Sequence, residues 1–172
     1  PILLLREPAH CGELPIELVL VVSSRPGIRG VDIAAKAGVP VEVVARRALA
    51  EPEFSRRVTT AIDAAKVELV LLAGYACKWE IPQRYLGKVL NIHPALLPAF
   101  GGKGMYGHHV HEAVLKHGCK VSGCTVHFAD QTYDTGPILV QRACPVFLDD
   151  TPDTLAARVF AEECLAYPEA IR

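Results

Sequence analysis

The chain has 172 residues, of which 51% are hydrophobic and 22% charged, and its net charge is −1. This length suits one domain with a substantial core, and the near-neutral charge provides no global field to attract nucleic acid or a membrane. The six cysteines include no CxxC pair, which favours free thiols in a reducing compartment. No apolar run approaches a membrane span, and "PILLLREP" is too short for a signal peptide. We therefore expect a cytoplasmic monomer or homodimer with small-molecule partners and no nucleic-acid or membrane partner.

Apolar, β-branched runs alternate with helical patterns along the chain. The runs that predict strands span residues 16–24, 39–45, 67–74, 88–94, 122–129 and 138–146. The patterns that predict helices span residues 30–38, 52–66 and 108–118, and a last helix begins at Pro152 after the N-cap Thr151. This alternation indicates βαβ units and a mainly parallel sheet, with an antiparallel hairpin at the last two strands. No repeat or linker is visible, so we expect a single domain over residues 1–172.

The stretch "KVLNIHPALLPAF" ends an apolar strand in two polar residues. Asn91 and His93 are two positions apart, so their side chains point the same way in an extended chain. Ligands of open α/β sheets bind beyond the carboxyl ends of the strands. Asp134 lies in the loop that follows another predicted strand. The fold class therefore predicts that Asn91, His93 and Asp134 converge.

These three side chains have the chemistry of an acyl-transfer site. Asn91 and a protonated His93 could donate hydrogen bonds to an oxyanion, and a nearby Asp134 would favour the charged imidazole and receive protons. No serine or cysteine is placed as a nucleophile, which favours direct attack by a second substrate. The residues taken singly are equally compatible with turn-forming or structural roles, and Asp134 in "YDTGP" suits a turn. Residue chemistry alone thus indicates an α/β enzyme or ligand-binding domain.

Four longer stretches resemble one known family. "LNIHPALLPAF", "GHHVHEAVL", "VSGCTVHFADQTYDTGPILVQRACPV" and "DTLAARVFAEECLAYPEAI" are similar to the glycinamide ribonucleotide formyltransferases, which belong to the 10-formyltetrahydrofolate-dependent formyltransferase family. The resemblance runs from about Leu18 to the end of the chain. It implies a Rossmann-like three-layer α/β fold, mostly parallel with an antiparallel C-terminal part. It also implies formyl transfer from 10-formyltetrahydrofolate, a co-substrate, to the amine of glycinamide ribonucleotide in purine biosynthesis, without a metal.

The resemblance also assigns roles to single residues. Asn91, His93 and Asp134 match the catalytic residues, and Pro98 matches a proline that follows a cis peptide bond. The substrate-binding residues it implies are Pro94, His109 and Glu163. The folate-binding residues it implies are Ala76, Cys77, Lys78, Trp79, Ala129, Asp130, Gln131 and Tyr133. Four histidines, at 108, 109, 111 and 117, do not form the compact i, i+4 ligand pair of a zinc helix, so we expect no metal site.

The start of the chain departs from the family pattern. The family opens with a strand and a glycine-rich loop that binds phosphate, and no such loop precedes residue 16. Either the chain lacks that first strand, or Ile2–Leu5 supplies it. The alternatives to the leading function are a deformylase, a sugar or tRNA formyltransferase, and a non-catalytic folate-binding domain.

Overall fold

The computed structural model describes Leu14 and residues 16–172 of the chain. Six strands and four α-helices follow one another, with two short 3₁₀-helices at Arg46–Ala48 and Gln83–Tyr85. The strands are β1 (Val21–Ser23), β2 (Val41–Val43), β3 (Val70–Ala73), β4 (Val89–His93), β5 (Val121–Phe128) and β6 (Ile138–Pro145). The helices are α1 (Arg29–Lys36), α2 (Glu51–Ala64), α3 (His108–Lys116) and α4 (Pro152–Ile171).

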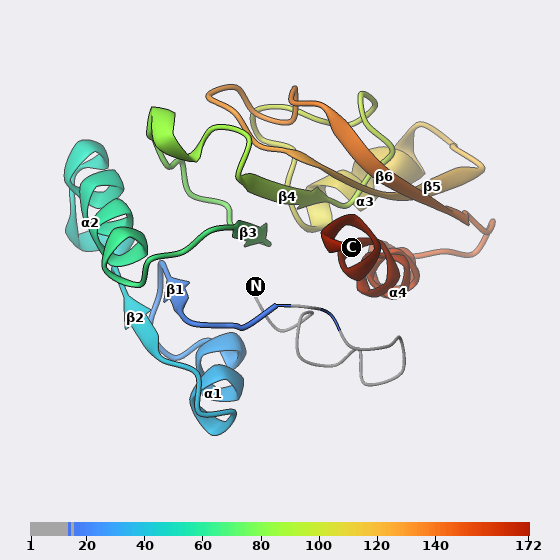
Figure 1. Cartoon of the computed structure of the whole chain (residues 1–172). Coiled ribbons are helices and arrows are strands. Elements are labelled where there is room, and N and C mark those ends of the chain that lie inside the picture. Colours follow the sequence, from blue (N-terminus) through green and yellow to red (C-terminus); the bar gives the residue numbers. More distant parts are fainter. Residues whose placement is uncertain (1–13, 15) are drawn as a thin grey trace.

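The described strands form two sheets. β1 and β2 make a two-stranded parallel sheet, and the other four make a sheet in the order β3-β4-β5-β6. In the larger sheet β3 and β4 are parallel, whereas β5 is antiparallel to both β4 and β6. Figure 1 shows the small sheet with α1 set apart from the larger one. The antiparallel C-terminal hairpin is therefore confirmed.

Two apolar clusters cover the two faces of the larger sheet. On one face, Leu90 and Ile92 of β4 pack with residues of α3 and α4, including the fully buried Leu155 and Tyr167. On the other face, Val89 packs with α2 residues and with the segment that follows β3. Figure 1 shows α2 and α4 on opposite sides of this sheet. The result is the expected three-layer α/β arrangement.

The predicted elements are present with shifted ends. The run at 16–24 becomes only the three-residue β1, and the run at 39–45 becomes β2, whose Glu42 and Val43 are exposed because β2 lies at a sheet edge. The cap predicted for the last helix is confirmed: the Thr151 side chain accepts a hydrogen bond from the Thr154 N–H, at 3.2 Å. The Leu97–Pro98 peptide bond is cis, as expected.

Candidate functional site

The end of β4 carries Asn91 and His93 on one face of the sheet. Both alternate with Leu90 and Ile92, which face the opposite core. The antiparallel register pairs Asn91 with His127 of β5. Strand pairing thus brings a second histidine beside the two side chains that the sequence singled out.

Asn91 and His127 are joined by a hydrogen bond. His127 Nδ1 lies 2.9 Å from the carbonyl oxygen of Phe128, which can only accept, so Nδ1 carries the hydrogen. The other ring nitrogen of His127, Nε2, then accepts from Asn91 Nδ2 at 3.1 Å, since an amide nitrogen can only donate. This bond fixes which way the Asn91 amide points and leaves its second N–H available to a ligand.

His93 is buried between two oxygen atoms. Its Nε2 donates to the carbonyl oxygen of Phe100 at 2.8 Å, and its Nδ1 lies 3.6 Å from Asp134 Oδ2. Burial lowers the pKa of His93 below its usual value, although Asp134 and the Phe100 carbonyl both act to raise it. We expected the aspartate to favour the charged imidazole, and it does raise the pKa of His93, but desolvation outweighs it. His93 is therefore mainly neutral near pH 7.

Asp134 is held in the site by backbone geometry as well as by charge. It has a positive φ of 58°, uncommon for a residue other than glycine, and its Oδ2 accepts from the Gly102 N–H at 2.8 Å. Burial opposes its ionisation, but the ring of His127, the Gly102 N–H and His93 together hold the pKa of Asp134 below its usual value. Asp134 Oδ1 also lies 3.6 Å from His127 Nε2. Asp134 is therefore an anion that contacts both histidines.

A polar network fixes the loop that follows β4. The Thr125 hydroxyl, fully buried on β5, donates to the Ala95 carbonyl at 2.7 Å and accepts from the Leu97 N–H at 3.0 Å. The Gln141 amide of β6 donates to the Leu97 carbonyl at 2.9 Å and to Thr125 Oγ1 at 3.0 Å. These bonds set the path of the chain toward Phe100, whose carbonyl oxygen receives the His93 hydrogen bond.

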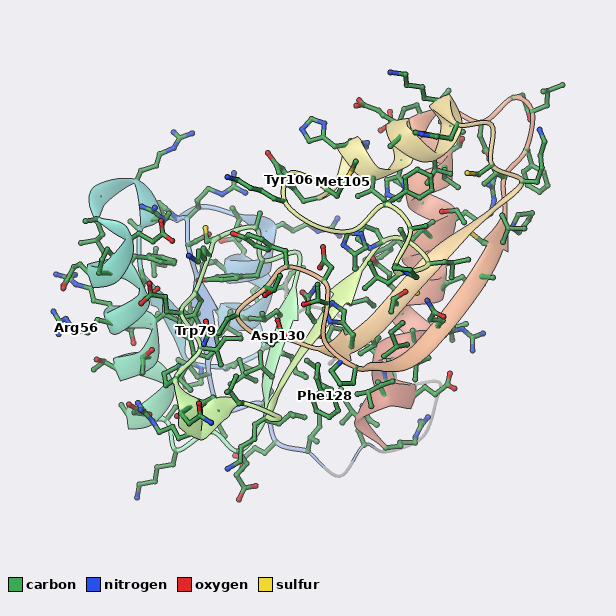
Figure 2. The ribbon with its side chains drawn as sticks, turned by 90° about the horizontal axis from the view of Figure 1, so that it is seen from above. Arg56, Trp79, Met105, Tyr106, Phe128 and Asp130 are labelled. Carbon is green, nitrogen blue, oxygen red and sulfur yellow. The ribbon has the colours of Figure 1, made fainter. Side chains whose placement is uncertain are left out.

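The residues expected to bind folate lie on two adjoining loops, which Gln131 joins by donating to the Ile81 carbonyl at 2.6 Å. Trp79 is buried in the core and its Nε1 donates to Thr59 Oγ1 at 3.0 Å, so its ring is already packed within the protein. Figure 2 labels Trp79 and Asp130 on these loops. Of the other expected residues, Cys77 and Ala129 pack against the α2 core, Lys78 pairs with Glu51 at 3.5 Å, and Ala76, Asp130 and Tyr133 are exposed.

The residues expected to bind the second substrate are scattered. Pro94 adjoins His93 and is partly buried, whereas His109 is exposed and lies 3.5 Å from Glu112 Oε2. His111, its partner in the H-x-H pattern, is buried; its pKa is lowered by burial, with smaller effects from His108 and His93. Glu163 lies on α4, where burial raises its pKa to about 7. Burial and, to a smaller extent, the charge of Glu163 raise the pKa of Cys124. The Cys124 side chain points to the face of β5 opposite that of His127.

His127 and the backbone groups of Phe100 and Gly102 were not predicted from the sequence. His127 was part of the quoted "TVHF" stretch, and the signal that could have found it is its pairing with Asn91, which requires the strand register. The backbone groups could not be predicted, because the main-chain N–H and C=O groups are the same whatever the side chain. Within the described residues, no group of three or more His, Cys, Asp or Glu side chains could hold a metal, and no helix there is long and apolar enough to cross a membrane.

Comparison with known proteins gives consistent matches. The formyl transferase family model matches residues 5–171. The chain is 42% identical to a chloroplastic phosphoribosylglycinamide formyltransferase of Arabidopsis thaliana, over 97% of this chain and 59% of that protein. It is 35% identical to the human trifunctional purine biosynthetic protein adenosine-3, over 97% of this chain and 16% of that protein. The structure matches glycinamide ribonucleotide transformylase 1 of Symbiobacterium toebii with a TM-score of 0.86 and 36% identity, over 98% of this chain and 79% of that chain.

Proposed function

Because the chain belongs to the formyl transferase family, we propose that it transfers a formyl group from 10-formyltetrahydrofolate to the amine of glycinamide ribonucleotide. The single observation that carries the proposal is the meeting of Asn91, His93 and Asp134 at the end of β4, with His93 Nδ1 3.6 Å from Asp134 Oδ2. The names of the similar plant and bacterial proteins support the choice of acceptor. The chain spans 59% of the plant relative, so the activity and both substrates are part of the proposal.

The reaction needs an electrophile held beside a hydrogen-bond donor. The acceptor amine attacks the formyl carbon, a C–N bond forms, and the carbonyl electron pair moves to oxygen. The Asn91 N–H that does not bond to His127 stabilises this oxyanion. Collapse of the tetrahedral intermediate breaks the bond from the formyl carbon to the folate nitrogen. The amine loses one proton and the folate nitrogen gains one, so no external acid or base is consumed.

His93 and Asp134 handle that proton. A neutral His93 can accept the proton that the attacking amine releases, either directly or through water. The imidazolium that results lies beside the anionic Asp134, which favours the charged form once it has been made. His93 then returns the proton to the departing folate nitrogen. In this mechanism the lowered pKa of His93 prepares it to act as a base first and as an acid second.

Residues outside this trio bind the substrates. The folate lies along the loop between β5 and β6, which carries the exposed Asp130 and Tyr133, and along the adjoining loop after β3, which carries the exposed Ala76. The Gln131 bond to the Ile81 carbonyl holds the two loops together for that contact. The acceptor is bound by Pro94, His109 and Glu163. Burial raises the pKa of Glu163 to about 7, so its carboxyl can accept a hydrogen bond from a substrate hydroxyl when ionised and donate one when protonated.

The test replaces Asn91, the oxyanion donor, with alanine. We expect Asn91→Ala to lower kcat by about 100- to 1,000-fold, because one preorganised donor is lost, while folate binding measured by fluorescence changes little. The control is Gln83→Ala, an exposed amide on the short helix Gln83–Tyr85, which should leave kcat unchanged.

Three outcomes would contradict the proposal. Full formyl-transfer activity in Asn91→Ala would remove the oxyanion role. Release of free formate without formylation of the amine would indicate a deformylase, since water would then be the acceptor. Folate binding by the intact chain with neither transfer nor hydrolysis would indicate a binding domain.

A further inference from the structure

Thr125 stands directly opposite His93 in the larger sheet. The antiparallel register of β4 and β5 pairs these two residues, so their side chains lie on the same face of the sheet. Thr125 is fully buried and takes no part in the steps proposed for Asn91, His93 and Asp134. Buried polar side chains are hydrogen-bonded, so the partners of this hydroxyl group show what it does.

The Thr125 hydroxyl has no hydrogen-bonding capacity left for a substrate. A hydroxyl group has one hydrogen to donate and two lone pairs with which to accept. The hydrogen goes to the Ala95 carbonyl at 2.7 Å, and the oxygen accepts from the Leu97 N–H and from the Gln141 side-chain amide, both at 3.0 Å. Because the protein fills all three positions, Thr125 acts on other parts of the protein and not on a bound molecule.

Thr125 and Gln141 together hold the start of the loop between β4 and α3. The Gln141 amide has a second hydrogen, which it donates to the Leu97 carbonyl at 2.9 Å. The pair therefore binds three main-chain groups, the Ala95 carbonyl and both polar groups of Leu97. Ala95 and Leu97 are buried, so water could not take over these bonds unless the loop moved.

The next contacts along this loop are those of the reacting residues. The Phe100 carbonyl accepts from His93 Nε2 at 2.8 Å, and the Gly102 N–H donates to Asp134 Oδ2 at 2.8 Å. A shift at Leu97 is therefore carried through a short stretch of chain to both contacts. A displacement of about 1 Å in a reacting group can cost about 100-fold in rate.

The Phe100 bond decides which ring nitrogen of His93 can act as a base. A neutral imidazole carries one hydrogen, and the Phe100 carbonyl can only accept, so this hydrogen lies on Nε2. Nδ1 then keeps the lone pair that takes a proton. The carboxylate of Asp134, 3.6 Å from Nδ1, is also an acceptor and would draw the hydrogen to Nδ1 if the Phe100 bond were lost. The position of the loop therefore selects the tautomer of His93.

We propose that Thr125 is a positioning residue for His93. Its hydroxyl, with the Gln141 amide, holds the loop so that the Phe100 carbonyl keeps the His93 hydrogen on Nε2 and leaves Nδ1 free to accept a proton. The inference rests on the proposed function, in which neutral His93 is the base.

Thr125→Val removes the hydroxyl and keeps the shape of the side chain. We expect kcat to fall by about 10- to 100-fold, because the loop shifts, while folate binding measured by fluorescence changes little. Thr125→Ser keeps the hydroxyl and should recover most of kcat. Thr60→Val makes the same change at an exposed threonine of α2, so it is the matched control and should leave kcat unchanged.

Nitrogen-15 NMR of the His93 ring, recorded without substrates, tests the positioning role separately from activity. In the unaltered chain the hydrogen should lie on Nε2, and in Thr125→Val most molecules should carry it on Nδ1. If the unaltered chain catalysed no formyl transfer but Thr125→Val changed the tautomer in this way, the proposed function would fail while the effect of Thr125 on His93 would be supported.

Gln141→Met is the second variant and keeps the test decisive if Thr125→Val does not fold. Gln141 is exposed on β6, so its replacement leaves the core intact while it removes the bonds to Leu97 and Thr125. The tautomer should change in the same direction. An unchanged His93 tautomer in folded Thr125→Val, or in Gln141→Met if the first variant does not fold, would overturn the proposal. So would a Thr125→Ser variant that is as inactive as Thr125→Val.

Discussion

The charge state of His93 results from two opposing neighbours. Desolvation lowers its pKa, and Asp134, 3.6 Å away, raises it. We predict that Asp134→Asn lowers the pKa of His93 further, since the raising influence is removed. In the proposed mechanism neutral His93 is the base, so activity falls as the pH drops through this pKa, and the fall should begin at a lower pH in the variant. NMR titration of the His93 ring and a pH profile of kcat/KM measure both effects.

Two results would contradict this account of the pair. One is an unchanged or raised His93 pKa in Asp134→Asn. The other is full activity of the variant, because loss of acid–base assistance typically costs about 100-fold or more. Glu42→Gln is a suitable control, since Glu42 is exposed on β2 of the small sheet.

Glu163 makes the stability of the fold depend on pH. Burial raises its pKa from 4.5 to about 7, so between these values the folded state binds more protons than the unfolded state. The free energy of unfolding therefore falls as pH rises from about 4.5 to 7. We predict that Glu163→Gln removes this loss and is more stable than the unaltered chain at pH 8, by roughly 3 kcal/mol for a shift of this size.

Urea unfolding at pH 4 and pH 8 measures this difference. At pH 4 the two proteins should have similar stabilities, because the carboxyl is protonated in both states. Glu162→Gln is a matched control on the same helix, although it also removes the 2.8 Å ion pair of Glu162 with Arg142. A Glu163→Gln variant that is equally or less stable at pH 8 would show that Glu163 ionises near its ordinary pKa.

Individual site residues could be predicted only where residue type and strand position coincide. Asn91 and His93 stand out because polar side chains end an apolar strand, and Asp134 was identified through its family motif. His127 did not stand out, because its contact with Asn91 depends on the register of two antiparallel strands. The neutral state of His93 also escaped prediction, since it depends on burial.

At the scale of elements, the site depends on the loop between β4 and α3. Phe100 has a φ of 55°, and this loop delivers both the Phe100 carbonyl to His93 and the Gly102 N–H to Asp134. A Cβ atom at Gly101 would lie 2.6 Å from Leu97 Cδ2 and 3.3 Å from Asp134 Cβ. A methyl group at position 101 would therefore require the Leu97 side chain to move and the hairpin carrying Asp134 to shift by a few tenths of an ångström.

We predict that Gly101→Ala lowers kcat by tenfold or more while costing only about 1–3 kcal/mol of stability, because the added methyl group separates Asp134 from the Gly102 N–H. Gly104→Ala is the matched control in the same loop. Position 104 has a φ of 90° and open space around its Cβ, so that variant should lose about 1 kcal/mol through backbone strain and keep its kcat. Steady-state kinetics with thermal unfolding separates the two effects. Equal losses of activity in both variants would contradict the argument from close approach.

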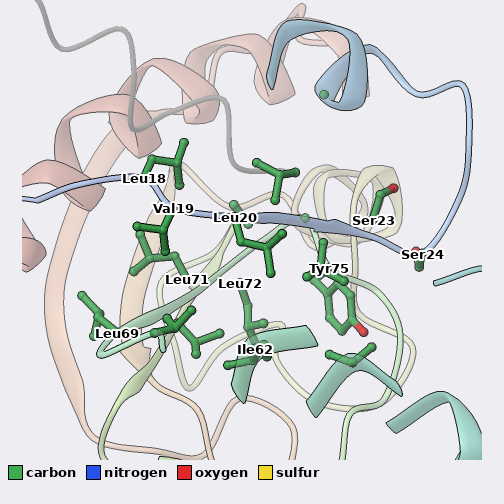
Figure 3. A pocket seen from close by; sticks show the side chains of 18 of the residues that line it. Leu18, Val19, Leu20, Ser23, Ser24, Ile62, Leu69, Leu71, Leu72 and Tyr75 are labelled. Carbon is green, nitrogen blue, oxygen red and sulfur yellow. The ribbon is translucent and has the colours of Figure 1, made fainter. Parts of the chain in front are cut away.

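The elements themselves were more predictable than the connections between them. Apolar runs and helical spacing predicted the six strands and four α-helices of the described residues, and the cap at Thr151 was found from local chemistry. The hydrogen bonds that shape the loop between β4 and α3, such as that from Gln141 to the Leu97 carbonyl, join residues far apart in sequence. No local sequence pattern predicts them. The length of β1 was overestimated, because Leu18, Val19 and Leu20 line the pocket between β1 and β3 (Figure 3) and do not pair with β2. The strand considered at Ile2–Leu5 lies outside the described residues.

At the scale of the whole molecule, the two sheets have cores of unequal size. The cluster around the larger sheet joins β4, β5, α3 and α4 and contains fully buried side chains such as Tyr167 and Leu155. Among the described residues, the cluster that packs α1 against the small sheet has three buried members, Val21, Ala34 and Val39. Each buried aliphatic side chain contributes about 1.5–3 kcal/mol, so the unit formed by β1, α1 and β2 has far less holding it in place.

We predict that this small unit opens before the rest of the molecule unfolds. Hydrogen exchange in increasing concentrations of denaturant should show the Val44 amide, which donates to the Ser23 carbonyl at 2.9 Å, opening at about 2 kcal/mol or more below amides of β5, such as Val126. The Val44 amide is chosen because β2 pairs with the edge of β1 that faces away from β3, so its bond to β1 does not depend on what lies between β1 and β3. Val126 is the reference because it is fully buried between β4 and β6. A single opening free energy shared by β2 and β5 would contradict this prediction. It would mean that the contacts between the two sheets couple them as tightly as a continuous sheet would.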